Sequence, residues 1–288
     1  MADYKIITDS ACDLSEEMLK ALDVTAVPLH LLFKGKNIPD TVEDRTIKKF
    51  YAGMRDGEVS KTSAVNPEAW RNAMEPVLAQ GMDVLVLGFS SGLSTTYQSA
   101  VIAAEELQEK YPQRKIRVVD SRCASLGQGL LVWYAAKNRD AGMELEEAYQ
   151  WLEEHKDNLC HWFTVEDLMY LKRGGRISAA TALVGTMLQI KPVLHMDDEG
   201  HLINVSKSRG RKASIQALAQ KMGELQLPGE NDTVFICHGD CVEDAQYLAG
   251  LVKEQYGVKE VVIGYVGAVI GSHSGPGTLA LFFLGKNR

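Results

Sequence analysis

A run of hydroxyl side chains around residue 90 is the first feature of this sequence that could carry out chemistry. Residues 83–88, DVLVLG, are almost entirely apolar, which is typical of a strand buried on both faces of a parallel sheet. Ser90, Ser91 and Ser94 follow in a short stretch that also contains glycine, and a helical apolar period begins at Ser94. Free N–H groups at a helix start attract anions, and hydroxyls add further donors. The stretch therefore predicts a site for a small anionic group at the carboxyl end of a strand.

The same stretch also matches a catalytic motif. Residues 88–92, GFSSG, fit the G-x-S-x-G pattern of a nucleophile elbow, with a strand before them and a helix after them. Ser90 would then be the nucleophile of a serine esterase or lipase-like hydrolase, with His238 or His273 as its base. Against this alternative, no HGGG-type oxyanion loop is present, and both candidate bases belong to the second half of the chain. Hydrolysis therefore stands as the second hypothesis.

Further polar residues could serve the same anion site. Thr62 and Ser63 form a second hydroxyl-bearing loop, and His273 stands in GSHSGPG, which predicts an exposed loop that approaches a ligand closely. Arginines form two clusters in an otherwise acidic protein, which favours an anionic ligand or partner surface over plain solvated charges. These arginines are Arg173, Arg176, Arg209 and Arg211.

Motifs for metals and nucleotides are missing from the sequence. Cys237, His238 and Cys241 are residue types that bind metals, but C-x3-C is not the usual zinc spacing. The sequence also has no second closely spaced cysteine pair to complete a zinc site. There is no P-loop pattern and no protein-kinase motif set. Residues 275–280 fit G-x-G-x-x-A, but only eight residues follow, too few for the βα unit of a dinucleotide site. We therefore expect no metal and no cofactor.

The composition is that of an ordinary globular protein. The chain has 288 residues, of which 45% are hydrophobic and 24% charged. Its net charge of −7 argues against a broad nucleic-acid footprint. No apolar stretch reaches membrane-spanning length, the first residues lack the features of a signal peptide, and the five cysteines are odd in number and widely spread. We expect a cytoplasmic protein with reduced cysteines, no nucleic-acid partner and no stable membrane insertion.

Strand and helix patterns alternate along the first half of the chain. This order predicts an α/β domain over residues 1–158, with a mainly parallel sheet wrapped by helices. Ligands collect at the carboxyl ends of the strands in such sheets, so the loops that carry Thr62 and Ser90 are expected at one edge. From residue 159 to 288 a hairpin-like pattern and further helices predict a second, α+β domain. The apolar run 177–188 is expected to be core. The clearest predicted elements are strands over 4–8, 83–88 and 116–119, and helices over 67–79, 125–141 and 145–155.

Taken together, these segments resemble one known family. The chain resembles the DegV family, which includes the fatty-acid-binding subunits of bacterial fatty acid kinase. The resemblance covers nearly the full length, and its segments keep the family order. The matching segments are ITDS from Ile7, KTS from Lys61, SSGLS from Ser90, YQSA from Tyr97, VDS from Val119, LKRGGRI from Leu171, KP from Lys191, RGRKA from Arg209 and IGSHSGPG from Ile270.

The resemblance implies a carrier rather than an autonomous enzyme. It implies a two-domain α/β protein that encloses one long-chain, palmitate-like fatty acid between its domains. Thr62, Ser94 and His273 match the residues that hold the carboxylate, with Ser63 and Ser91 as candidates for support. A separate ATP-binding fatty acid kinase subunit would form the acyl phosphate. In that reaction His273 and Arg209 are expected to assist phosphoryl transfer, while Arg173 and Arg176 are expected to face the partner.

Overall fold

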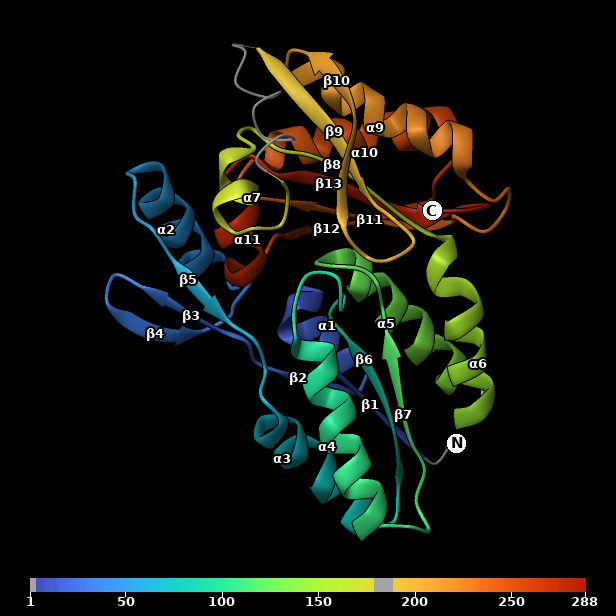
Figure 1. The fold of residues 1–288 in the computed structure, drawn as a ribbon. Coiled ribbons are helices and arrows are strands. Elements are labelled where there is room, and N and C mark those ends of the chain that lie inside the picture. The colour runs from blue at the N-terminus through green and yellow to red at the C-terminus, as the bar shows by residue number, and fades with distance from the viewer. Residues whose placement is uncertain (1–3, 179–188) are drawn as a thin grey trace.

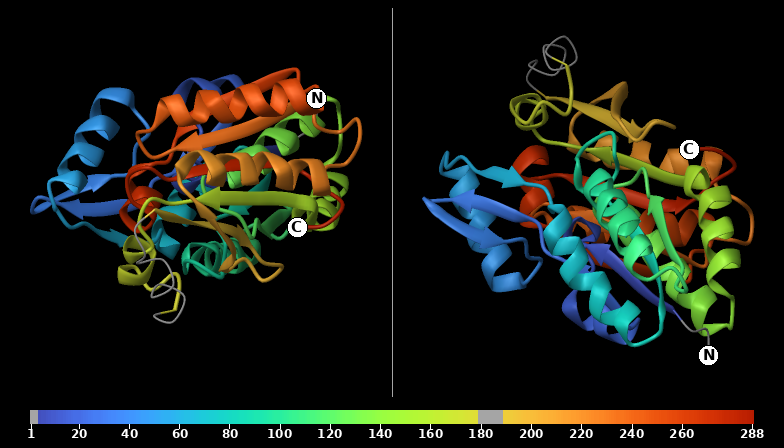
Figure 2. Two further views of the ribbon diagram at one scale, coloured as in Figure 1. Left: turned by 90° about the horizontal axis from the view of Figure 1, so that it is seen from above. Right: turned by 60° about the horizontal axis from the view of Figure 1, so that its bottom comes forward.

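The computed structural model of the protein describes residues 4–178 and 189–288. Over these residues two main sheets stack with a helix between them, and a small third sheet projects to one side (Figure 1). The small sheet lies on the opposite side of the molecule from the C-terminus in all the ribbon views (Figure 2). Most of the apolar run expected to be core, residues 179–188, lies outside the described residues.

The N-terminal sheet is parallel, which confirms the prediction for this half of the chain. Within the described residues its strand order is β2-β1-β6-β7. The residues VLVL of β6 have no exposed surface, which explains their continuous apolar run. Thr8 pairs with Leu87 and Gly88 with Asp120, so the loops after β1, β6 and β7 meet at one edge. The strands are β1 (Tyr4–Asp9), β2 (Val24–Val27), β6 (Asp83–Gly88) and β7 (Ile116–Asp120), and the helices of this half are α1 (Glu16–Ala21), α3 (Pro67–Ala79), α4 (Thr96–Lys110), α5 (Leu126–Asp140) and α6 (Leu145–His155).

Local capping signals account for several helix boundaries. The Ser15 side chain caps α1, and the Asn66 side chain accepts the N–H of Ala69 at the start of α3. These signals are why the predicted bounds of α3 agree with the structure. Helix α4 instead begins at Thr96, two residues later than its apolar period predicts, so Ser94 lies in the loop before the helix.

The position of Thr62 corrects the sequence prediction. Thr62 was expected in a loop at the edge of the parallel sheet, but it lies on a strand of the small antiparallel sheet, whose order is β4-β3-β5 in the described structure. The three-residue strand β5 carries no apolar alternation that could have predicted it. This sheet consists of β3 (His30–Phe33), β4 (Lys36–Pro39) and β5 (Lys61–Ser63), and α2 (Asp44–Arg55) lies beside it in the ribbon (Figure 1).

The C-terminal half contains a mixed sheet with the last strand near its centre. Its order over the described residues is β10-β9-β8-β13-β11-β12, and β13 is antiparallel to both neighbours. All residues of β13, LALFFL, are buried, as expected of a central strand. The strands are β8 (Leu159–Thr164), β9 (Ile190–Met196), β10 (Leu202–Arg209), β11 (Thr233–His238), β12 (Glu260–Tyr265) and β13 (Leu279–Leu284), and the helices are α7 (Met169–Arg173), α9 (Arg211–Leu225), α10 (Val242–Tyr256) and α11 (Ala268–Ser274).

Helix α5 joins the two main sheets. It packs against β1 and β6 on one side and against β8, β11 and β13 on the other, so most of its residues are buried and it shows little amphipathic pattern. Two glycines allow this close approach: a Cβ on Gly127 would lie 2.8 Å from the Phe282 ring, and one on Gly129 would lie 2.6 Å from the carbonyl oxygen of Cys12. One hydrophobic core therefore spans both halves, and the domain boundary at 158/159 stays a prediction.

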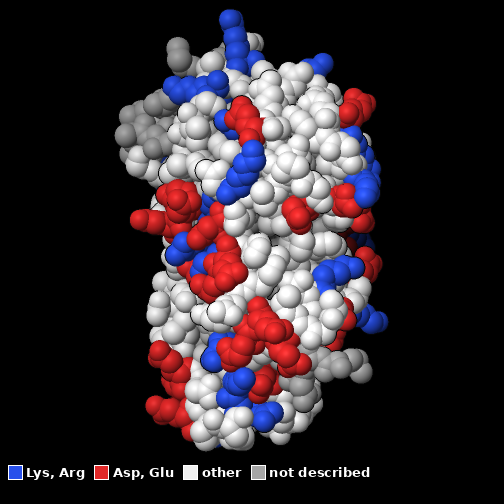
Figure 3. Space-filling model, turned by 90° about the vertical axis from the view of Figure 1, so that its right-hand side faces the viewer, with Lys and Arg blue, Asp and Glu red and all other residues white. Residues whose placement is uncertain are grey.

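Charges on the molecule are mixed in sign. Figure 3 shows acidic and basic side chains interspersed over the face that includes α6, rather than a broad basic patch. On α6, for example, Glu146 pairs with Arg117 at 2.7 Å. Among the described helices, none is both long enough and apolar enough to cross a membrane.

Candidate functional site

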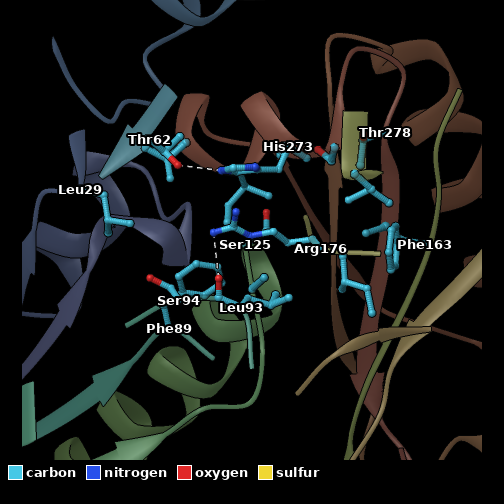
Figure 4. A pocket seen from close by; sticks show the side chains of 18 of the residues that line it. Leu29, Thr62, Phe89, Leu93, Ser94, Ser125, Phe163, Arg176, His273 and Thr278 are labelled. Atoms are coloured by element: carbon cyan, nitrogen blue, oxygen red, sulfur yellow. Dashed lines mark hydrogen bonds between the residues drawn. The ribbon is translucent and has the colours of Figure 1, made fainter. Parts of the chain in front are cut away.

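A cavity of about 420 Å³ lies where the small sheet, the loop after β6 and the C-terminal half meet. Its volume falls within the range of ~300–1,000 Å³ that is usual for small-molecule sites. Most of its wall is apolar, including Leu29, Phe89 and Phe163, and polar side chains gather in one part of it (Figure 4). That polar part contains Thr62, Ser94, Arg176 and His273. The cavity therefore combines a hydrocarbon-like interior with a polar end.

Thr62 and His273 lie side by side in the cavity wall although they are 211 residues apart in the sequence. Thr62 Oγ1 and His273 Nε2 lie 2.7 Å apart, within hydrogen-bond distance. The neighbouring pair Ser60 and Ser272 makes a parallel link, with 2.7 Å between their hydroxyl oxygens. His273 was expected in an exposed loop, but it lies on α11 and is largely buried, because the GSHSGPG stretch folds back against β5.

The imidazole of His273 is neutral at physiological pH. Burial, followed by the nearby positive charge of Arg176, lowers the pKa of His273 to about 4. A neutral imidazole has one N–H donor and one lone-pair acceptor, so His273 can bond the Thr62 hydroxyl and still offer its other ring nitrogen. It can therefore take part in a hydrogen-bond chain without supplying a fixed positive charge.

Ser94 lies beside the start of α4. Its Oγ accepts the N–H of Thr96 at 3.2 Å and lies 2.9 Å from the Thr96 hydroxyl. That same Thr96 hydroxyl accepts the N–H of Val65, which follows strand β5. Thr96 thus ties together the two hydroxyl-bearing segments of Thr62 and Ser94. The sequence contains its hydroxyl beside Ser94, but nothing in the local pattern indicates this long-range link.

Arg176 is the only cation that lines the cavity among the described residues. Its guanidinium donates to the carbonyl oxygen of Leu93 at 3.0 Å and to that of Gly174, and no described carboxylate pairs with it. Burial lowers the pKa of Arg176, yet arginine remains a cation at physiological pH. Figure 4 shows the guanidinium between His273 and the loop of Ser94. Arg176, expected to face a partner, therefore lies inside the site.

The supporting serines also border the cavity, but both already have protein partners. Ser63 is exposed, and its hydroxyl lies 3.4 Å from the carbonyl oxygen of His30. Ser91 donates its hydroxyl to Asp120 at 2.5 Å and its N–H to the same carboxylate at 3.1 Å. Ser91 therefore shapes the loop, and its backbone and side chain are already engaged.

The remaining arginines lie outside the cavity wall. Arg173 is exposed above the ring of Tyr170, with 5.1 Å between the guanidinium carbon and the ring centre. Arg209 is exposed at the end of β10, and Arg211 donates to Asp244 at 2.8 Å. Arg173 and Arg209 are thus accessible to a partner, whereas Arg211 is already paired.

The geometry around Ser90 contradicts the hydrolase alternative. Ser90 is 0% exposed, does not line the cavity, and donates its hydroxyl to the carbonyl oxygen of Gly200 at 2.8 Å. Neither candidate base contacts it: His273 bonds Thr62, and His238 accepts the N–H of Cys241. The Gly-x-Ser-x-Gly match is therefore structural, and its serine joins the N-terminal half to the turn at residues 197–200.

Buried carboxyl groups hold the helix that carries His273. Asp40 accepts the N–H of Val269 at 2.9 Å, near the start of α11, and the hydroxyl of Ser10 at 3.0 Å. Asp13 also lies beside Gly267, because a Cβ there would clash with Asp13 Oδ1 and lie 3.3 Å from Asp40 Oδ1. Burial raises the pKa of Asp13 and of Asp40, and the Asp40 charge raises that of Asp13 further. Both carboxyls therefore favour their protonated, uncharged forms more than an exposed aspartate does.

This cluster is expected to make stability fall as the pH rises. The folded protein holds these carboxyls protonated at pH values where an unfolded aspartate, with a pKa of ~3.9, has lost its proton. The contribution is present at low pH and is lost as the pH rises through the folded pKa, which burial raises to about 6 for Asp40. Asp40→Asn keeps an acceptor for Val269, so it should flatten this dependence by on the order of 1 kcal/mol.

Denaturant unfolding between weakly acidic and neutral pH would measure this slope. Asp44→Asn is the matched control, because hydrogen bonds from Lys48 and Tyr265 lower the pKa of the exposed Asp44. A carboxylate with a lowered pKa makes stability rise with pH, so removing it cannot flatten a stability that falls with pH. An unchanged slope in Asp40→Asn would contradict a raised pKa of Asp40 in the folded protein.

The comparisons with known proteins agree with this geometry. A family model described as "Uncharacterised protein, DegV family" matches residues 3–286. The DegV domain-containing protein CPE0026 of Clostridium perfringens is 47% identical, over 100% of this chain and 99% of its own length. The DegV domain-containing protein YteA of Lactococcus lactis is 35% identical, over 98% of each chain.

Solved structures share the fold over almost the whole chain. The Thermotoga maritima protein TM841, described as revealing a fatty acid binding function, has 31% identity and a TM-score of 0.87, over 99% of this chain and 100% of its own. A Thermus thermophilus DegV family protein, described with its fatty acid binding, has 31% identity and a TM-score of 0.87, over 98% and 99%. The Streptococcus pneumoniae Fatty Acid Kinase (Fak) B3 protein, loaded with linoleic acid, has the same fold at 22% identity, with a TM-score of 0.85 over 99% of each chain. Because a family model, sequence relatives and folds all match over nearly the full length, this chain belongs to the DegV family.

Proposed function

We propose that this protein binds one long-chain fatty acid in the cavity and presents its carboxylate to a separate ATP-binding kinase subunit. The observation that carries this proposal is the cavity itself, with an apolar wall and one cation without a described carboxylate partner, Arg176, at its polar end. The relatives from Thermotoga maritima and Thermus thermophilus, which are described as binding fatty acids, support the same ligand class.

The energetics of such a ligand divide between its two ends. An acyl tail gains ~0.8 kcal/mol for each buried CH₂, so a palmitate-like chain has an upper limit of ~12 kcal/mol before ordering costs. A buried carboxylate is costly unless it is paired. Arg176 would supply the charge, while Thr62, Ser94 and the neutral His273 would supply hydrogen bonds. The tail then provides affinity, and the head-group residues provide orientation.

The acyl phosphate would form with a partner rather than in this chain alone. The sequence has no nucleotide-binding motif, so ATP would come with the kinase subunit. A carboxylate oxygen would attack the terminal phosphorus of ATP, forming the new O–P bond as the bond to ADP breaks. His273 and Arg209 would assist this transfer, and the exposed Arg173 would face the partner. This role sets the protein in the bacterial cytoplasm, where ATP is present.

Lipid extraction tests the binding half of the proposal. The purified protein should release a fatty acid on denaturation, and Thr62→Ala with Ser94→Ala should weaken its retention by roughly tenfold or more, because two hydroxyl partners are lost. Thr25→Ala is the matched control, since Thr25 is an exposed hydroxyl residue of β2 that does not line the cavity. Mass spectrometry of the extract identifies the chain. A protein that carries no lipid and does not bind added palmitate would contradict the proposal.

Arg209→Ala tests the kinase half. Arg209 does not line the cavity, so the variant should retain its fatty acid while acyl-phosphate formation with a fatty acid kinase subunit falls at least tenfold. Phosphate transfer from labelled ATP measures the second step. Equal loss of lipid binding and of phosphorylation would contradict the separation of roles.

A further inference from the structure

His161 is a polar side chain in the part of the cavity that Phe163 lines, away from the polar end described above. His161 is on β8, 5% exposed, and lines the cavity together with Phe163. Strand alternation explains its direction: Cys160 and Trp162 belong to the core on the other face of the sheet, under α9 and α10. His161 and Phe163 therefore share the face that borders the cavity.

The Nδ1 atom of the His161 ring has no partner in the described protein. Nδ1 is buried without a hydrogen bond, and the contacts of the ring with described residues are aromatic ones. The ring packs edge-on against Phe282, with centroids 4.7 Å apart, and against Phe163 at 5.5 Å. A phenyl ring would make these contacts equally well. Packing therefore accounts for an aromatic ring at this position but not for its Nδ1 atom, which is costly to bury unpaired.

The chemistry of the missing partner follows from the ionisation of this ring. Burial lowers the pKa of His161 to about 3, with Arg288 adding to the effect, so the ring is neutral at physiological pH. A neutral imidazole presents one donor and one acceptor. A carboxylate would bring a charge that this apolar part of the cavity leaves unpaired. A hydroxyl can accept the ring N–H or donate to the ring lone pair, and a keto oxygen can accept the ring N–H, without adding a charge. The complementary group is thus an uncharged oxygen.

Strand geometry separates His161 from the polar end of the cavity. In the pairing of β8 with β13, Phe163 lies opposite Ala280 and His161 lies opposite Phe282. Thr278, which directly precedes β13, is on the His273 side of the cavity. His161 is two residues beyond Phe163 in the direction away from Thr278, so it lies ~7 Å farther from the polar end than Phe163 does. Figure 4 shows Phe163 across the cavity from Thr62 and Ser94. A ligand held by its carboxylate would meet His161 only with its tail.

We propose that His161 makes the cavity selective for acyl chains that carry a hydrogen-bonding oxygen, a hydroxyl or keto group, within the hydrocarbon tail. The inference rests on the fatty-acid binding proposed above and specifies the class of fatty acid. An oxygen at the depth of His161 pairs a buried nitrogen that a plain hydrocarbon chain leaves unpaired. The plain chain still binds through its carboxylate and its buried methylenes, but it forgoes this hydrogen bond.

A positional series of hydroxystearates tests the inference against stearate. Delipidated protein should bind at least one mid-chain hydroxystearate roughly tenfold more tightly than stearate, the effect of one buried hydrogen bond. α-Hydroxystearate, with its hydroxyl beside the carboxylate, should show no such gain. His161→Phe should abolish the mid-chain preference without weakening stearate binding, and His161→Gln, which keeps a donor and an acceptor, should retain part of it. Phe163→Leu is the matched control, because Phe163 lies on the same face of the strand but has no hydrogen-bonding group. This variant should keep the mid-chain preference.

The possible outcomes separate this inference from the proposed function. If stearate binds and no mid-chain hydroxystearate binds more tightly, the inference is overturned and the fatty-acid function stands. A preference that survives in His161→Phe also overturns it, because the hydroxyl then has another partner. If wild-type protein binds none of these chains, the proposed function fails as well. Should His161→Phe not fold, the wild-type series and the His161→Gln variant still support or overturn the inference.

Discussion

Arg176→Met is expected to lower the affinity for a long-chain fatty acid by roughly 100-fold while changing the affinity for the matching fatty alcohol only a few-fold. The guanidinium is the only described cation in the cavity wall, and it has carbonyl partners but no described carboxylate partner. A bound carboxylate would lose both its charge partner and charge-assisted hydrogen bonds. An alcohol head group is uncharged, so it has no ion pair with Arg176 to lose. Titration calorimetry of acid and alcohol with each protein measures the two affinities.

The comparison of acid with alcohol also separates charge from positioning. Arg176 holds the carbonyl oxygen of Leu93, next to Ser94, so its loss could disturb the loop as well as the charge. Disturbance of the loop would weaken both ligands equally, and that result would contradict a charge role. Arg173→Met is the matched control, because Arg173 belongs to the same basic turn but is exposed. It should leave both affinities unchanged.

Gly200→Ala is expected to reduce the free energy of unfolding by about 3 kcal/mol or more. Gly200 has a φ of +78°, and an added Cβ would clash with Ser90 Oγ and lie 3.2 Å from the Arg122 backbone. The substitution therefore combines left-handed backbone strain with a steric clash at the contact between the two halves. It would also disturb the hydrogen bond from Ser90 to the carbonyl oxygen of Gly200.

Gly35→Ala isolates the backbone part of this effect. Gly35 has a similar φ of +73°, but an added Cβ would meet nothing within 4 Å. It should cost about 1 kcal/mol, the usual penalty for a side chain in the left-handed region. Chemical denaturation of both variants measures the difference. Equal losses would show that the turn at residues 197–200 moves away freely, which would contradict a fixed contact with Ser90.

Long, continuous patterns in the sequence predicted the parallel sheet and most helices correctly. The buried run of β6 needs no distant partner to be identified, because both of its faces are covered by helices. Asn66 and the proline after it set the start of α3, so its predicted range agrees with the structure. These signals are local, and tertiary contacts reinforce them rather than override them.

Short elements were beyond the reach of such patterns. Strands β4 and β5 have four and three residues, and their sequences KNIP and KTS show no apolar alternation. Helix α11 contains glycine and serines that usually predict a loop, and it is held by Asp40 from the other half of the chain. Because long-range hydrogen bonds and packing form these elements, Thr62 and His273 were predicted as loop residues and found on a strand and a helix.

The sequence by itself determined the family, the parallel sheet and the set of residue types at the site. The tertiary structure decided which of those residues face the cavity. Arg173 and Arg176 are three positions apart, yet one is exposed and the other lines the cavity. Ser90 and Ser94 are four positions apart, yet Ser90 is buried against Gly200 and Ser94 lines the cavity. The direction of a side chain from a short turn depends on contacts with distant segments, and local sequence spacing carries no information about those contacts.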